Sequence, residues 1–126
     1  MMLKKILVVD DEPDFCEALR DLFKGKGYHV VVALSGEEAL AAYRQHQPNL
    51  VILDMMMPGM SGLVTLRELK GLDPEASVVV VTALNEEGLA KQALAEGALD
   101  YITKPINSEY LELVLSTKLA LIDADK

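Results

Sequence analysis

Short apolar segments rich in β-branched residues alternate with longer segments of helical periodicity along the whole chain of 126 residues. Several short segments are apolar at every position, which is typical of parallel strands covered on both faces. The expected strands are residues 6–10, 29–33, 50–54, 77–82 and 101–103. This repeated order of strand and helix predicts an α/β fold with a right-handed, doubly wound parallel sheet and helices on both faces.

Capping residues and glycines mark where the helices should begin and end. The expected first residues or caps of the helices are, in order, Pro13, Ser35, Ser61, Asn85 and Ser108. Ser35 is followed by Glu38 in the spacing of a capping box, and Gly97 suits the end of the fourth helix. The last helix should bury a stripe formed by Leu111, Val114, Leu115, Leu119 and Ile122.

The chain carries 12 basic and 20 acidic residues, a net charge of −8. This field opposes direct binding to nucleic acid or to anionic membranes, so proteins, metal cations and small phosphorylated donors are the expected partners. A single cysteine excludes an internal disulfide and fits a cytoplasmic location. No apolar run approaches the length needed to cross a bilayer. We expect one domain over residues 1–122, with residues 123–126 as a tail or the start of a linker.

Several polar residues fall at the carboxyl ends of the expected strands, where ligands bind in open α/β sheets. They are Asp10, Asp11 and Glu12 after the first strand, Asp54 after the third, Thr82 and Ala83 after the fourth, and Lys104 and Pro105 after the fifth. Each has a structural explanation when taken alone, such as an acid at a helix start or a solvated end-of-strand lysine. Their common placement at one edge favours a single site.

Carboxylates crowded at one edge repel each other, and a hard divalent cation with oxygen ligands relieves that repulsion. Magnesium fits better than zinc because His29, His46 and Cys16 are not spaced as ligands. A carboxylate can also attack phosphorus to give an aspartyl phosphate, while a metal and an ammonium group neutralise the transferring charge. These considerations leave open which acid is the nucleophile.

Four stretches resemble the receiver domain of bacterial two-component response regulators, and the resemblance covers essentially the whole chain. They are residues 6–12 (ILVVDDE), 53–62 (LDMMMPGMSG), 81–83 (VTA) and 97–105 (GALDYITKP). Each stretch alone is a weak pattern, but all four in this order and at these spacings are highly specific. The resemblance implies a flavodoxin-like fold with strand order 2-1-3-4-5.

The resemblance also implies a role for each matching residue. Asp54 resembles the phosphoacceptor, and the implied magnesium ligands are Asp11, Asp54, Asp10 through water and the backbone carbonyl of Met56. Lys104 resembles the lysine that contacts the phosphoryl group, aimed by a cis peptide at Pro105, with Glu12 in a supporting position. Thr82 and Tyr101 look like the switch pair, and Ala83 is the small residue that leaves room for the phosphoryl group.

Two departures from the family pattern bear on behaviour. Met56 and Leu84 occupy positions that influence hydrolysis of the phosphoryl group, and neither side chain can orient water, which predicts slow hydrolysis, although both could simply pack a loop. Residues 107–121 lack the arginines that many family members use for dimer ion pairs. Lys91 and Asp100 could still contribute to a dimer through the fourth helix, fifth strand and fifth helix, but a symmetric dimer is less favoured.

The leading interpretation is a phosphorylation-activated signalling switch that takes its phosphoryl group from a histidine kinase or phosphotransfer protein. It would catalyse only its own phosphorylation and dephosphorylation, and would then change its contacts with an output domain or protein target. The alternatives are a phosphate-independent docking module and a magnesium-dependent aspartyl-phosphate phosphatase. Such phosphatases usually carry a second acid two residues after the nucleophile, where this chain has Met56.

Overall fold

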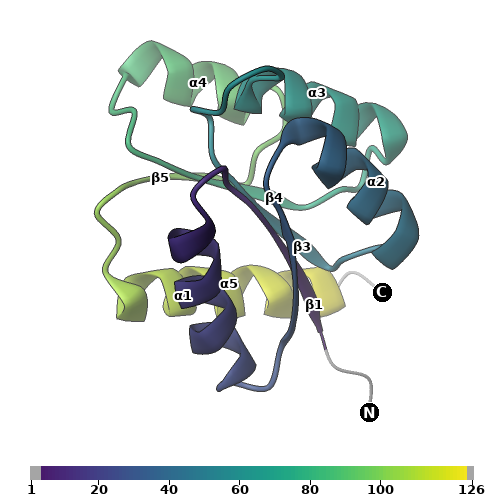
Figure 1. The fold of residues 1–126 in the computed structure, drawn as a ribbon, viewed down its shortest axis with the longest axis vertical. Coiled ribbons are helices and arrows are strands. Elements are labelled where there is room, and N and C mark those ends of the chain that lie inside the picture. The colour runs from purple at the N-terminus through teal and green to yellow at the C-terminus, as the bar shows by residue number, and fades with distance from the viewer. Residues whose placement is uncertain (1–3, 125–126) are drawn as a thin grey trace.

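A computed structural model describes residues 4–124 and contains one five-stranded parallel sheet of order β2-β1-β3-β4-β5 (Figure 1). The elements are β1 (Lys5–Val9), α1 (Pro13–Lys24), β2 (His29–Ala33), α2 (Gly36–His46), β3 (Leu50–Leu53), α3 (Gly62–Leu72), β4 (Val78–Thr82), α4 (Glu87–Ala95), β5 (Asp100–Thr103) and α5 (Ser108–Ala124). The predicted fold class and strand order are confirmed. None of the helices in the described range has the length and apolar character needed to cross a membrane.

The helices cover both faces of the sheet, as the uniformly apolar strands predict. Helices α1 and α5 lie on one face, and α2, α3 and α4 lie on the other (Figure 1). Successive residues of β1 point to opposite faces, so Ile6 and Val8 pack with α1 and α5 while Leu7 and Val9 pack on the other side. The central strands β1, β3 and β4 are therefore buried on both faces.

Asp10 and Asp54 each lie one residue beyond the end of a strand, rather than inside it as predicted. The backbone N–H of Asp10 still donates to the carbonyl of Ala33 at 3.1 Å, and that of Asp54 donates to Val9 at 3.0 Å. Both backbones are thus held by the sheet, while their side chains are free to point out of its edge. This placement is what brings the acids of neighbouring β1 and β3 together.

Two of the predicted serine caps are present. Ser35 accepts a hydrogen bond from the N–H of Glu38 at 3.1 Å, and Ser61 accepts from Val64 at 3.3 Å. Asn85 does not cap the fourth helix, because α4 begins only at Glu87 and its N-cap residue, Glu86, makes no side-chain capping bond.

Helix α5 is capped by a residue that the sequence interpretation passed over. The side chain of Asn107 accepts from the N–H of Tyr110 at 3.0 Å, and the helix then runs from Ser108 to Ala124. Leu111, Leu115 and Leu119 form its buried stripe as predicted. The side chain of Ile122 and residues 125–126 lie outside the described part, so the expected boundary at 122 stays a prediction.

Candidate functional site

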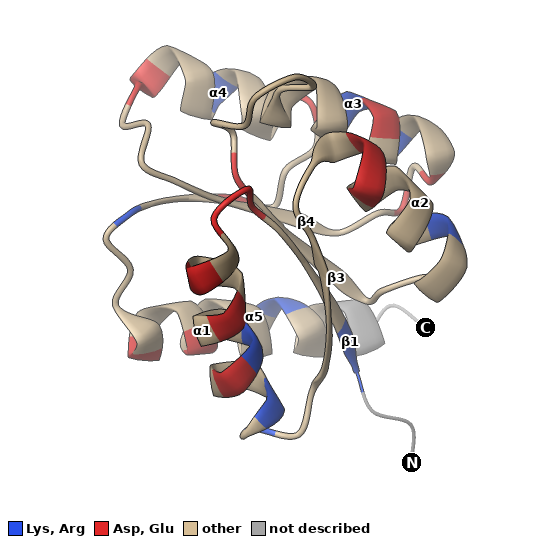
Figure 2. Ribbon diagram, in the orientation of Figure 1, with Lys and Arg blue, Asp and Glu red and all other residues tan. Residues whose placement is uncertain are grey.

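Three carboxylates meet at the carboxyl edge of the sheet, where acidic residues colour the turn between β1 and α1 (Figure 2). Oxygens of Asp10, Asp11 and Asp54 all lie within 4.8 Å of one another. Asp10 is only 1% exposed and Asp54 only 4%, whereas Asp11 is more open to solvent. The structure therefore brings together the acids that the sequence analysis expected to share a site, and two of them are nearly excluded from water.

Backbone hydrogen bonds fix one oxygen of each buried acid. Oδ1 of Asp10 accepts from the N–H of Glu12 at 2.9 Å, and Oδ1 of Asp54 accepts from the N–H of Met56 at 3.1 Å. Both bonds span two residues, as in the turns that aspartate typically forms with its own backbone. Each carboxylate is thereby oriented, and its second oxygen remains for other partners.

Lys104 supplies the positive charge of the site. Its Nζ lies 2.7 Å from Oδ2 of Asp10, 3.6 Å from Glu12 and 4.0 Å from Oδ2 of Asp54. The Lys104–Pro105 peptide is cis, as the resemblance implied. The N–H of Lys104 donates to the carbonyl of Thr82 at 2.7 Å, so β4 and the segment after β5 carry the lysine to this edge together.

Burial and neighbouring charges act differently on the two members of the closest ion pair. Burial raises the pKa of Asp10, and the bonds from Lys104 and Glu12 that lower it do not fully offset that rise. Burial lowers the pKa of Lys104, but the bond to Asp10 and the surrounding acids outweigh burial, and the net pKa is raised. The ammonium group is therefore firmly charged at neutral pH, beside a set of acids that it only partly neutralises.

A small hollow of about 460 Å³ opens over these groups. It is lined by Asp11, Glu12, Asp54, Met56, Met57, Pro58, Ala83 and Lys104. Ala83 is part of this lining and contributes only a methyl group to it. Met56 is 54% exposed, whereas its neighbours Met55 and Met57 are buried in the core. The side chain of Met56 thus borders the site instead of packing the loop.

Thr82 and Tyr101 both bond to the backbone of Leu84. Oγ1 of Thr82 accepts from the N–H of Leu84 at 3.4 Å, and the hydroxyl of Tyr101 donates to its carbonyl at 2.7 Å. Burial raises the pKa of Tyr101, and the charges of Glu86 and Asp54 add to that rise. The structure thus joins the two expected switch residues through one loop residue, Leu84, which follows Ala83 of the hollow.

Sequence interpretation missed two contributors to this geometry. Phe15, a residue of α1 to which the sequence analysis gave no role at the site, has its ring centroid 3.9 Å from Nζ of Lys104. Gly62, the first residue of α3, lies so close to the loop after β3 that an added Cβ would stand 2.3 Å from the carbonyl oxygen of Asp54. A side chain there would displace the acid, and the glycine two residues after the Pro-Gly-Met turn was the available signal.

A family model for the response regulator receiver domain matches residues 6–116. The transcriptional regulatory protein ZraR of Salmonella typhimurium is 42% identical over 115 residues, which is 91% of this chain but 26% of that protein. The chain therefore spans about a quarter of the length of this relative.

Solved structures share the whole fold. A response regulator receiver domain protein from Methanospirillum hungatei has a TM-score of 0.95 at 29% identity, covering 99% of this chain and 100% of that one. The CheX-CheY-BeF3-Mg+2 complex from Borrelia burgdorferi has a TM-score of 0.84 at 33% identity, covering 90% and 88%. With the matching fold, the acidic edge and the family model in agreement, the chain belongs to the response regulator receiver domain family of two-component systems.

Proposed function

We propose that this receiver domain is switched by transfer of a phosphoryl group to Asp54, with magnesium bound by the acids around it. The observation that carries the proposal is the meeting of Asp10, Asp11 and Asp54 within 4.8 Å, with Lys104 as the adjacent cation. The donor class is a phosphorylated histidine of a kinase or phosphotransfer protein. The domain acts on its own carboxylate and turns over no outside substrate.

The geometry favours Asp54 over Asp10 as the nucleophile. Oδ2 of Asp10 is engaged by Lys104 at 2.7 Å, and Asp10 does not line the hollow. Asp54 lines the hollow, its Oδ2 lies 4.0 Å from the same ammonium, and its Oδ1 is held by the N–H of Met56. An incoming phosphorus atom can therefore reach an oriented and less strongly paired oxygen. Among the three acids, Asp54 combines these properties best.

The donor set fits magnesium. Three carboxylates supply hard oxygen ligands, and partial exposure at Asp11 leaves room for the waters that magnesium keeps. We assign Asp11 and Asp54 as direct ligands, with Asp10 acting through water and the Met56 carbonyl completing the protein donors. The bound ion would supply charge neutralisation on the phosphoryl oxygens. The Borrelia burgdorferi CheX-CheY-BeF3-Mg+2 complex contains magnesium, which supports a role for the same ion here.

In the proposed transfer, Oδ2 of Asp54 forms a bond to phosphorus while the bond from phosphorus to the donor imidazole nitrogen breaks. The bonding pair remains on that nitrogen. Lys104 is close enough to move from Asp10 to a phosphoryl oxygen and neutralise part of its charge. Ala83 leaves space beside the new phosphoryl group. The carboxylate of Glu12, 3.6 Å from Nζ, is a second acid that pairs with Lys104.

The output step uses the residues joined through Leu84. Turning the Thr82 hydroxyl to a phosphoryl oxygen would remove an acceptor from the Leu84 N–H and disturb the carbonyl that holds Tyr101. The surface of α4, β5 and α5 would then change, and it already exposes large apolar side chains suited to a protein partner. These are Leu94, Tyr110 and Leu113.

Symmetric dimerisation through this surface gains little support. Lys91 is paired with Glu87 of its own helix at 3.1 Å, and Asp100 accepts from the N–H of Tyr101 at 2.8 Å. Both charged residues that could have served a dimer are thus engaged within the chain. An output domain or separate protein target is the better supported partner for the exposed apolar residues.

The deciding experiment is intact-mass measurement after incubation with acetyl phosphate, with and without magnesium. The wild type should gain one phosphoryl group only with magnesium, and Asp54→Asn should gain none, since the amide keeps the bond from Met56 but is not nucleophilic. Asp73→Asn, at the opposite edge of the sheet, is the matched control and should behave as the wild type. If acetyl phosphate and a histidine-phosphorylated donor both fail, the chain is a phosphate-independent docking module.

The exposed position of Met56 also supports slow hydrolysis of the phosphoryl group. Its apolar side chain borders the hollow beside Asp54 and cannot orient a water molecule. Met56→Asn should shorten the lifetime of the phosphorylated protein severalfold, whereas Met56→Leu should leave it unchanged. Loss of the label from the wild type within seconds would contradict this assignment. Leu84, which packs against the core, is less able to act this way.

A further inference from the structure

The ammonium group of Lys104 is enclosed by acids on one side and by an aromatic ring on another. Asp10, Glu12 and Asp54 lie within 4.0 Å of Nζ, and the ring centroid of Phe15 lies 3.9 Å from it. A cation over an aromatic face is attracted by the ring quadrupole at such distances. Only 15% of the Lys104 side chain is exposed, so little water competes with this contact.

Phe15 is well placed to hold the lysine because it is itself held. It lies in the first turn of α1, three residues after Glu12, and its ring packs against the buried cluster beneath α1 and α5. The ring is only partly buried, so one part anchors in the core while another remains available to the ammonium group. The acidic turn and the aromatic ring are thus supplied by one continuous segment.

We propose that Phe15 is a positioning residue that keeps the Lys104 ammonium beside Asp54, ready to meet the incoming phosphoryl group; this inference rests on the proposed phosphorylation of Asp54. A lysine stem is flexible, and the most exposed of the three acids is Glu12, with 68% of its side chain accessible. Without the ring, pairing with Glu12 draws the ammonium group out towards solvent. The ring opposes that excursion by attracting the charge and by excluding water from its side.

The size of the expected effect follows from the strength of such contacts. Removing the aromatic face while keeping apolar bulk should slow phosphorylation by acetyl phosphate about two- to fivefold. Phe15→Leu is the corresponding variant, and Phe15→Tyr keeps the ring and should restore the wild-type rate. Graded fluorination of the ring at position 15 weakens its negative face with little change of shape, and the rate should fall steadily with each added fluorine.

A double-mutant comparison separates positioning from a general effect on the core. If Phe15 acts through the lysine, Phe15→Leu should have no further effect on the rate in a Lys104→Ala background. Leu22→Ala, a change in a partly buried residue packed on the same cluster, should lower stability without changing the rate. An equal rate in Phe15→Leu and wild type, or the same slowing with and without Lys104, would overturn the proposal.

A readout that does not need phosphorylation keeps this inference separate from the proposed function. The ring should shift the NMR signals of the Lys104 side-chain protons nearest Nζ upfield, and this shift should vanish in Phe15→Leu and persist in Phe15→Tyr. Failure of the wild type to gain mass would remove the proposed function but leave this shift measurable. Absence of the shift in the wild type would show that the ring does not hold the lysine, whatever the phosphorylation result.

Discussion

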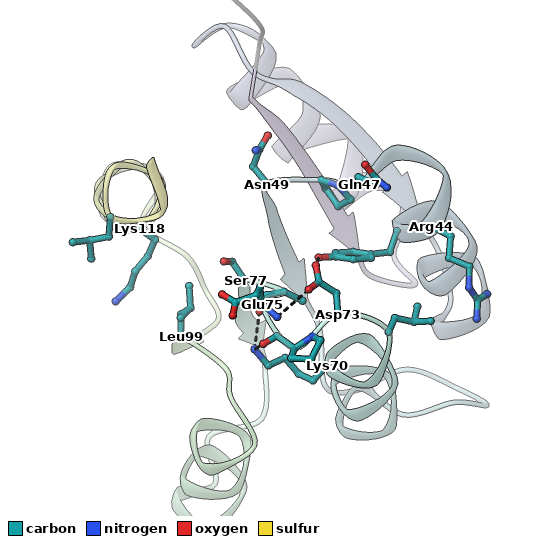
Figure 3. A pocket seen from close by; sticks show the side chains of 15 residues that line it. Arg44, Gln47, Asn49, Lys70, Asp73, Glu75, Ser77, Leu99 and Lys118 are labelled. Atoms are coloured by element: carbon teal, nitrogen blue, oxygen red, sulfur yellow. Dashed lines mark hydrogen bonds between the residues drawn. The ribbon is translucent and has the colours of Figure 1, made fainter. Parts of the chain in front are cut away.

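The two edges of the sheet carry hollows that differ in size and in electrostatic character. The hollow at the carboxyl edge is about 460 Å³ and is lined by acids that a single lysine does not neutralise. The hollow at the amino edge is about 1100 Å³ and is lined by residues that directly precede β3, β4 and β5, together with the end of α5 (Figure 3).

Three polar side chains at the amino edge make hydrogen bonds within the chain. The hydroxyl of Tyr43 donates to Oδ2 of Asp73 at 2.7 Å, and Nζ of Lys70 donates to the carbonyls of Pro74 and Ala76 at 2.9 Å each. Figure 3 shows these contacts gathered where the loop before β4 folds back. The loop is thereby tied to α2 and α3, and the hydrogen bonds serve the fold.

The site that we propose therefore lies at the smaller of the two hollows, and electrostatics distinguishes it better than size does. In the larger hollow, Tyr43, Asp73 and Lys70 are hydrogen-bonded within the chain, and basic and acidic side chains both line the walls. The smaller hollow is lined by Asp11, Glu12 and Asp54 against the single cation of Lys104, and the carboxylate of Asp54 is nearly excluded from water, which is costly unless a further cation arrives. Negative charge that is not fully neutralised, on acids held by the sheet, distinguishes the edge at which we propose the phosphoryl transfer.

Replacing the lysine at each edge should give the largest difference in stability between the two edges. Lys104→Met leaves the buried carboxylate of Asp10 without its cation and should lower the free energy of unfolding by about 3 kcal/mol in the presence of a chelator. Lys70→Met removes bonds to backbone carbonyls only and should cost about 1 kcal/mol. Urea denaturation of both variants measures the difference. An equal loss of free energy of unfolding in both variants would mean that Lys104 does not offset an unfavourable buried charge on Asp10.

Magnesium should stabilise the domain through the carboxyl edge alone. At a concentration about 100 times its Kd, the ion should raise the free energy of unfolding of the wild type by roughly 2.7 kcal/mol. Asp54→Asn should reduce this gain, because one of the three carboxylates is lost, whereas Asp73→Asn at the amino edge should keep it in full. Thermal unfolding with and without magnesium tests all three proteins. If magnesium still stabilised Asp54→Asn but not Asp73→Asn, the ion would bind at the amino edge and the prediction would be wrong.

The smallest effect concerns alkaline pH at the amino edge. Burial raises the pKa of Tyr43 above its ordinary value of 10.0, and the hydrogen bond to Asp73 raises it further. As pH rises above 10, the unfolded chain loses the phenol proton first, so the folded state should lose stability. Tyr43→Phe should cost about 1 kcal/mol at neutral pH from the lost bond.

The stability of the wild type and of Tyr43→Phe, measured over a range of pH, tests whether the phenol is buried. The difference in stability between the wild type and Tyr43→Phe should shrink above pH 10. Only the wild type has a phenol that stays protonated in the folded state while the unfolded chain has lost the proton. Phosphorylation at neutral pH should be the same in both proteins, because Tyr43 lies at the opposite edge from Asp54. A difference that stays constant with pH would show that the hydroxyl of Tyr43 is not buried against Asp73 in solution.

Much of the fold could be predicted from hydrophobic periodicity and from residues that begin and end helices. Uniformly apolar strands, the serine caps at Ser35 and Ser61, and Gly97 after the fourth helix are local features, and local features specify local structure. The fourth helix shows the limit of this reasoning. Asn85 has the chemistry of a cap, yet the helix starts at Glu87, because the loop after β4 is placed by contacts of Leu84 with Thr82 and Tyr101.

The sequence by itself determined which residues would gather at the carboxyl edge, because strand order and the direction of parallel strands place all strand ends together. Only the tertiary structure decided which of these charged side chains pair with one another. Whether Lys104 pairs with Asp10 or Asp54, and whether Phe15 faces the core or the lysine, depends on distances of a few ångströms between segments remote in sequence. Periodicity cannot report such distances, because it records the face of an element and not the reach of its side chains.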